Sequence, residues 1–136
     1  MKESRLAEWP EHFPDSCPPA DASPAEGFFY RIVDAAPPQD DDFLSNLRLF
    51  QLGKRFKRGK NWTDDCQAAG LSVLADRDEA INLRDSCGPM RRKAIAHGDT
   101  TGIGLMKHTP GRAGASHHTW WLPEGEKPAS DFEVVV

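Results

Sequence analysis

The sequence predicts a single α+β domain with a largely antiparallel, split sheet, two or three short helices and an irregular, proline-rich N-terminal leader. Three observations predict this fold. The chain has 136 residues, a normal length for one domain and too short for two that each bury a substantial core. Helical spacing occurs early, whereas strand-like segments fill the last third. Seven of the eleven prolines precede residue 39.

The leader is expected to comprise residues 1–26. Its segment 10–24 (PEHFPDSCPPADASP) alternates proline with small and acidic residues, a composition that supports neither a regular helix nor a strand ladder. We expect the leader to be poorly structured or to lie on the surface, where Trp9 and Phe13 could attach it to the folded body. The domain itself is expected to span residues 27–136.

The first strand and the first helix of the domain are predicted close together. Residues 28–33 (FFYRIV) are aromatic and β-branched, and the prolines that follow end this strand. Aspartates open the next segment, residues 40–52, which suits the N-terminus of a helix. A helix ending at Gly53 is expected there, because apolar residues recur at the spacing of one helical face, at Phe43, Leu44, Leu47 and Phe50.

The rest of the domain reads as a strand, a helix and a late group of strands. Residues 71–74 form a short apolar run, and Asp76 is placed to cap a helix over residues 77–84. Beyond Pro89, β-like segments alternate with Gly, Pro and Asp clusters. We expect these segments to pair consecutively as a meander, over residues 93–97, 103–108, 118–122 and 132–136.

Charge and cysteine content limit the classes of function. The net charge of −4 argues against a surface devoted to nucleic acid, and no stretch resembles a membrane span or a signal peptide. Cys17, Cys66 and Cys87 are odd in number and lack the spacing of a metal-binding pair, so we interpret them as free thiols. A cytoplasmic protein without a metal is expected.

Three short motifs in order carry a resemblance to a known group of enzymes. They are Phe29-Tyr30-Arg31, Gly70-Leu71-Ser72-Val73 and Ser116-His117-His118-Thr119-Trp120. Together they resemble the nicotinamide-binding half of ADP-ribosyltransferases and of the related RES-type NAD-degrading toxins. The pattern is most similar to small type VI secretion effector toxins of transferase-like fold.

The resemblance implies an enzyme that uses NAD as its substrate, by ADP-ribosyl transfer or NAD cleavage. In such a site Arg31 would bind the pyrophosphate, Ser72 would lie beside the nicotinamide amide, and Tyr30 would stack. The implied catalytic residues are Arg31, Ser72, His118 and Glu133, and the implied substrate-binding residues are Tyr30, Thr119 and Trp120. The resemblance further implies delivery as an effector without a signal peptide, and a cognate immunity or antitoxin protein as partner.

The catalytic glutamate of these families has no clear equivalent in this sequence. Glu133 lies in the last predicted strand, whereas Glu124 and Glu126 lie in a predicted turn. We assign the role to Glu133. The matched residues also admit ordinary structural roles: Tyr30 and Arg31 alternate across a strand, so one can be core and the other solvated.

Two other functions remain open from the residues alone. A metal-independent ribonuclease would combine one late histidine with a basic loop, made of Lys54, Arg55, Lys57, Arg58 and Lys60. His117 and His118 would point to opposite faces of a strand, so they are not expected to act together. A non-catalytic binding or immunity module would not gather Arg31, Ser72 and Thr119 around one cleft.

Overall fold

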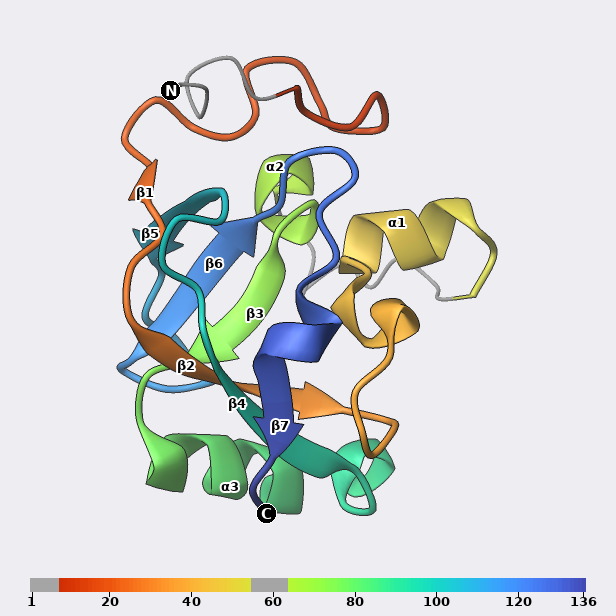
Figure 1. Ribbon diagram of the computed structural model, residues 1–136, viewed down its shortest axis with the longest axis vertical. Coiled ribbons are helices and arrows are strands. Elements are labelled where there is room, and N and C mark those ends of the chain that lie inside the picture. The colour runs from red at the N-terminus through yellow and green to blue at the C-terminus, as the bar shows by residue number, and fades with distance from the viewer. Residues whose placement is uncertain (1–7, 55–63) are drawn as a thin grey trace.

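The computed structural model describes residues 8–54 and 64–136 (Figure 1). Within these residues the chain forms one α+β domain around a seven-stranded antiparallel sheet, which confirms the predicted fold class. The helices are α1 (Asn46–Gln51), α2 (Asp65–Ala68) and α3 (Arg77–Ser86), with 3₁₀ turns η2 (Asp40–Phe43), η4 (Gly88–Met90) and η5 (Pro128–Asp131). The strands are β1 (Ser23–Pro24), β2 (Phe28–Val33), β3 (Leu71–Leu74), β4 (Ala94–Asp99), β5 (Leu105–His108), β6 (His117–Trp121) and β7 (Phe132–Val134).

The pairing of the late strands corrects the predicted meander. The sheet order is β1-β5-β6-β3-β2-β4-β7, so β5 and β6 form a hairpin but β4 lies beside β2. All six residues of β2 are paired with β4, from Phe28 opposite Asp99 to Val33 opposite Ala94. Periodicity identifies a strand but not its partner, because many antiparallel partners bury the same alternating side chains equally well.

The single helix predicted over residues 40–52 is also corrected, because the structure divides it into η2 and α1. Leu44 between them is extended, and Ser45 caps α1 by accepting a 3.1 Å hydrogen bond from the Arg48 amide. Asp42 receives the amide N–H groups of Asp34 and Gln39 on its carboxylate, which fixes η2 against the end of β2. Serine and aspartate favour such caps over helix interiors, so they restart the helix rather than continue it.

The sheet is split between β2 and β3. These two fully described strands share one register pair, Tyr30 opposite Leu74, and then diverge. The two halves, β1-β5-β6-β3 and β2-β4-β7, contribute to one core cluster, in which the rings of Trp120 and Phe132 lie 5.9 Å apart. Helix α3 covers the outer side through a second cluster that includes Leu74, Ala80 and Ile95.

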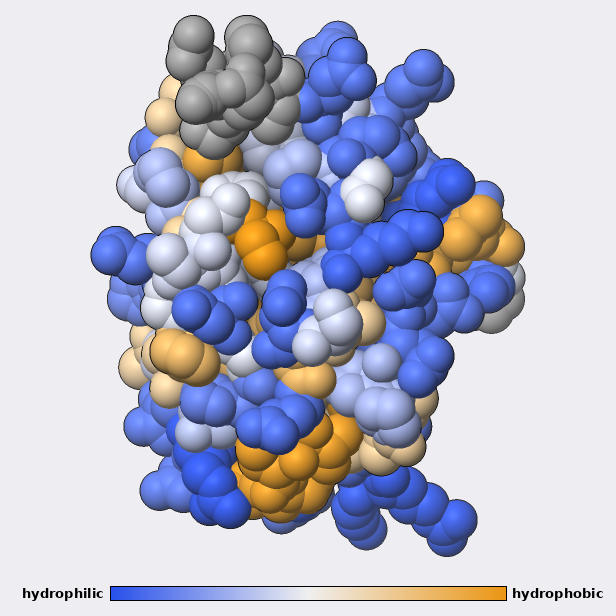
Figure 2. Space-filling view, in the orientation of Figure 1, coloured by the Kyte–Doolittle hydropathy of each residue, from blue (hydrophilic) through white to orange (hydrophobic). Residues whose placement is uncertain are grey.

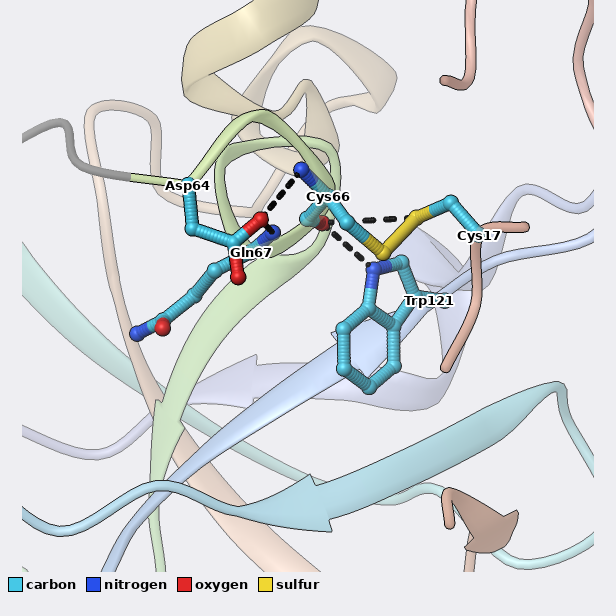
Figure 3. The surroundings of a disulfide bond; sticks show 5 residues. All are labelled: Cys17, Asp64, Cys66, Gln67 and Trp121. Carbon is cyan, nitrogen blue, oxygen red and sulfur yellow. Dashed lines mark hydrogen bonds between the residues drawn. A yellow bond between two sulfur atoms is a disulfide. The ribbon is translucent and has the colours of Figure 1, made fainter. Parts of the chain in front are cut away.

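The leader is bound to the body by a disulfide, so the free-thiol interpretation is wrong for two of the three cysteines. Cys17 and Cys66 are bonded, with Cα atoms 5.5 Å apart, whereas Cys87 is a free thiol. Figure 3 shows the Trp121 ring beside this bond, donating from Nε1 to the Cys66 carbonyl at 2.8 Å. A separation of 49 residues gives no local signal of pairing, which is why the sequence did not reveal the bond.

The described part of the leader is irregular except at β1, and it packs on the body. Trp9 and Phe13 join the cluster around Cys17, Leu47 and Trp121. Pro24 lies opposite Leu105 at the edge of the sheet, and Ala25 enters the main core. The leader thus contributes apolar contacts at two places on the body.

Hydrophilic residues dominate the face shown in Figure 2. A hydrophobic patch lies at its lower end, in the region where Figure 1 places the end of β7. No helix in the described ranges is long and apolar enough to cross a membrane.

Candidate functional site

A cleft of about 300 Å³ lies where β2 and β3 diverge. Four residues at the end of β2 form one wall (Tyr30, Arg31, Ile32 and Asp34), and four in and before β3 form the opposite wall (Gly70, Leu71, Ser72 and Leu74). Residues of η2 and α1 border the cleft on a third side. Three of the residues implicated by the resemblance line this cleft, namely Tyr30, Arg31 and Ser72. The cleft therefore depends on the split of the sheet.

Arg31 connects the two walls of the cleft. Its Nε donates to the Asp42 carbonyl at 2.8 Å, and its Nη1 donates to the Ser72 carbonyl at 2.9 Å. The guanidinium carbon lies 5.6 Å from the centroid of the Phe43 ring, a cation–π distance. Arg31 thus fixes the width of the split and places a positive charge in its wall.

Tyr30 points to the opposite side of β2 from Arg31, as alternation along a strand requires. Its ring stacks on His97 with centroids 4.3 Å apart, and His97 stacks on Phe28 at 5.3 Å. Tyr30 lines the cleft from this stack, while Ser72 is exposed on the facing strand. An aromatic group and a hydroxyl therefore border the same cavity.

Carboxylates outnumber cations among the residues that line the cleft. Asp34 forms an ion pair with Lys93 at 3.0 Å, and the Asp42 carboxylate is occupied by two backbone amides. Asp41, on the exposed side of η2, also lines the cleft. The arrangement favours a ligand that carries positive charge close to this rim.

Two other implicated residues lie behind the cleft rather than in it. Thr119 is opposite Ser72 in the β3–β6 register but is 2% exposed, and its hydroxyl lies 2.9 Å from that of Thr109. Trp120 is fully buried, and its Nε1 donates to the Ile103 carbonyl at 2.7 Å. The convergence expected of an enzyme is therefore seen for Arg31 and Ser72 and not for Thr119.

Glu133 and the basic loop are also separate from the cleft. Glu133 is exposed on β7 opposite His97, and β7 is the edge strand beyond β4. Lys54 is exposed in the turn that follows α1, whereas Arg55, Lys57, Arg58 and Lys60 lie outside the described residues.

The adjacent histidines His117 and His118 point to opposite faces of β6. His117 is buried, with Nδ1 3.0 Å from the Thr109 carbonyl, and burial is the main cause that lowers its pKa from the ordinary value of 6.5. His118 faces the inner side, where its ring lies 4.9 Å from Phe29 and 4.8 Å from His108. The sequence did not indicate the His108 contact, because it depends on the β5–β6 register.

In the described part of the chain, no three His, Cys, Asp or Glu side chains gather as a metal site.

Comparisons with known proteins add no constraint to this geometry. No family model, curated protein or solved structure matches the chain.

Proposed function

We propose that the cleft between β2 and β3 binds the nicotinamide-ribose half of NAD⁺, and that the protein cleaves this dinucleotide or transfers ADP-ribose from it. One observation carries the proposal. The resemblance assigns three residues to an NAD site, and all three line one cavity: Tyr30, Arg31 and Ser72. They come from two different strands, and Arg31 and Ser72 are 41 positions apart in the sequence.

The chemistry of the cleft suits the oxidised nicotinamide ring. This ring is a pyridinium cation, so a rim that contains the Asp41 carboxylate favours it over a neutral ring. Tyr30 offers a ring for stacking, and the Ser72 hydroxyl can donate to or accept from the carboxamide. A cavity of about 300 Å³ is at the small end of ligand sites, which suits half of the dinucleotide.

Arg31 serves this site without leaving its carbonyl partners. Its charge lies between the walls of the cleft, where it would attract the pyrophosphate that extends from the ribose. The same bonds hold η2 at a fixed distance from β3. Arg31 therefore has both a binding role and a positioning role in the proposal.

The proposal moves the carboxylate role from Glu133 to Asp41. When the bond between C1′ and the nicotinamide nitrogen breaks, nicotinamide leaves with the bonding electrons and positive charge develops on the ribose. Water or an acceptor nucleophile then attacks C1′. A carboxylate stabilises that charge only from nearby, and Asp41 lines the cleft whereas Glu133 lies on the edge strand.

The expected cytoplasmic location and immunity partner are parts of the same proposal. The Cys17–Cys66 bond requires that the protein pass through an oxidising compartment, because disulfides form and persist mainly there. A secreted effector would form the bond outside the reducing cytosol of the producing cell and carry it to its target.

The function is tested by incubating the full chain with NAD⁺ and measuring release of free nicotinamide. Binding of NAD⁺, NADH and ADP-ribose is compared in parallel by calorimetry. The proposal predicts the order NAD⁺ tighter than NADH, because reduction removes the ring charge, and nicotinamide release above the buffer control. A folded protein that neither binds nor consumes NAD⁺ at millimolar concentration would contradict it and favour the binding module.

A further inference from the structure

His108 and His118 form a cross-strand pair at the inner side of the β5–β6 hairpin. They are directly opposite in the register of these strands, and their ring centroids lie 4.8 Å apart with planes inclined by 33°. His108 is exposed, and His118 is half-buried against Phe29. The pair is therefore fixed on one side and open to solvent on the other.

Each ring has one nitrogen occupied by a backbone carbonyl. Nε2 of His108 lies 2.7 Å from the Ala115 carbonyl oxygen, and Nδ1 of His118 lies 2.8 Å from the Ser116 carbonyl oxygen. A carbonyl only accepts, so each of these nitrogens carries the proton in the neutral ring. Nδ1 of His108 and Nε2 of His118 then hold lone pairs. Donation of the second ring N–H to a carbonyl is the usual arrangement around metal-binding histidines.

The loop that supplies these carbonyls is itself fixed by a carboxylate. Oε1 of Glu79 accepts from the Ser116 amide at 2.8 Å and from the Ser116 hydroxyl at 2.7 Å. The Ser116 hydroxyl in turn accepts from the amides of Ala75 and Asp76. A side chain at Gly114, whose φ is +153°, would collide with Glu79, so the sequence leaves room for this contact. The orientation of both imidazoles is thus built into the fold.

The separation of the ring centroids is one that a shared metal ion allows. Metal–nitrogen distances of about 2.0–2.1 Å and ligand angles between a right angle and the tetrahedral value place two imidazole centroids about 4.5–5.2 Å apart. The observed 4.8 Å falls inside this range. We propose that His108 and His118 bind a divalent late transition-metal ion such as Zn²⁺ or Cu²⁺, with water at the remaining positions.

This site is independent of the proposed NAD cleft, since neither histidine lines that cleft. The competing use of the pair is acid–base cleavage of RNA by two imidazoles without metal. The metal is favoured because the two rings lie at a separation that one ion can bridge, with one nitrogen of each ring not taken up by a carbonyl.

The test is calorimetric titration of the full chain with Zn²⁺ and, separately, Cu²⁺. Saturable binding of one ion is expected, tighter for Cu²⁺ than for Zn²⁺ as imidazole sites generally show. His108→Ala and His118→Gln should each weaken Zn²⁺ binding at least tenfold. His97→Ala and Cys87→Ser serve as matched controls, because they remove another half-buried histidine and the free thiol, and they should leave the affinity unchanged.

Circular dichroism of each variant identifies any that fail to fold, and exposed His108 gives the variant least expected to perturb the core. Three results would overturn the proposal. The parent fails to bind Zn²⁺ at millimolar concentration, folded His108→Ala binds as tightly as the parent, or the parent cleaves RNA in the presence of a chelator and loses this cleavage in His108→Ala.

Discussion

The guanidinium of Arg31 donates to the backbone carbonyl of Ser72 at 2.9 Å, across the position where the sheet divides. Ser72 is paired with Thr119 on its other side, so this carbonyl would face an unfilled gap if β2 and β3 simply separated. The arginine replaces the missing strand partner with a charged donor. The cleft and its stability are therefore linked through one side chain.

Replacing Arg31 should lower stability as well as NAD⁺ affinity. Arg31→Ala removes two hydrogen bonds from a charged donor, each worth roughly 1.5–3 kcal/mol. Because the site is half-buried, water can bind the two freed carbonyls and offset part of this loss. We expect urea denaturation to show a loss of about 2 kcal/mol and calorimetry to show NAD⁺ binding weakened about tenfold or more.

Arg31→Lys is the matched control for this change. Lysine keeps the charge but lacks the planar fork that reaches two carbonyls at once, so it should recover affinity and stability in part. An unchanged urea midpoint in Arg31→Ala would show that the two carbonyl contacts do not hold the walls together.

The Cys17–Cys66 disulfide should stabilise the domain through the leader. Closing a loop across a separation of 49 residues is worth about 4 kcal/mol in the chain-entropy description. Cys17→Ser should lower the denaturation midpoint and make the leader the first target in limited proteolysis. Cys87→Ser, which removes the free thiol, should do neither. Equal protease resistance of parent and Cys17→Ser would argue against a tethered leader.

Stability should fall as the pH drops below about 6.5. Burial is the main cause that lowers the pKa of His117 and also that of His12 below the ordinary 6.5. Between the folded and unfolded pKa values the unfolded chain binds more protons, so stability is fully present above 6.5 and decreases as pH falls through the folded values. Thermal denaturation from pH 7.5 to 5 measures this slope, and His117→Gln should flatten it. A slope identical in His117→Gln would exclude His117 as its source.

Glu79 should control the order of the loop that joins β5 and β6. Glu79→Ala removes the acceptor of two hydrogen bonds from Ser116, which should cost about 1–3 kcal/mol and increase hydrogen exchange at the Ser116 amide. It should also weaken Zn²⁺ binding at His108 and His118, because their carbonyl partners lose support. Asp78→Ala, an exposed neighbour on α3, is the control. Exchange at Ser116 that does not change in Glu79→Ala would contradict this role.

The sequence located every described strand except β1, because the other strands have a strong local signal, whereas β1 lies in the segment expected to be irregular. FFYRIV and LSVL became β2 and β3 with the predicted bounds, and Asp76 caps α3 as expected. Local signals do not, however, determine where a helix is interrupted or which strands pair. The break at Leu44 and Ser45 and the position of β4 beside β2 depend on contacts with distant parts of the chain.

Part of the candidate site was also predictable. Tyr30, Arg31 and Ser72 could be selected from short motifs, and they share a cleft. Asp41 could not, because its place at the rim follows from the turn of η2, and one aspartate among three consecutive ones carries no distinguishing signal. The His108–His118 pair required the hairpin register, and the Cys17–Cys66 bond required the path of the leader.

The most direct test of the proposed function is calorimetric titration of NAD⁺ into the parent, Asp41→Asn and Glu133→Gln. Both substitutions remove one exposed carboxylate, but only Asp41 lines the cleft. A carboxylate about 4 Å from the pyridinium charge attracts it by roughly 1 kcal/mol in bulk water and by roughly 4 kcal/mol near a protein surface. We predict saturable binding to the parent, about tenfold weaker binding to Asp41→Asn, and parental affinity in Glu133→Gln. Parental affinity in Asp41→Asn together with a loss in Glu133→Gln would contradict the placement of the nicotinamide in this cleft.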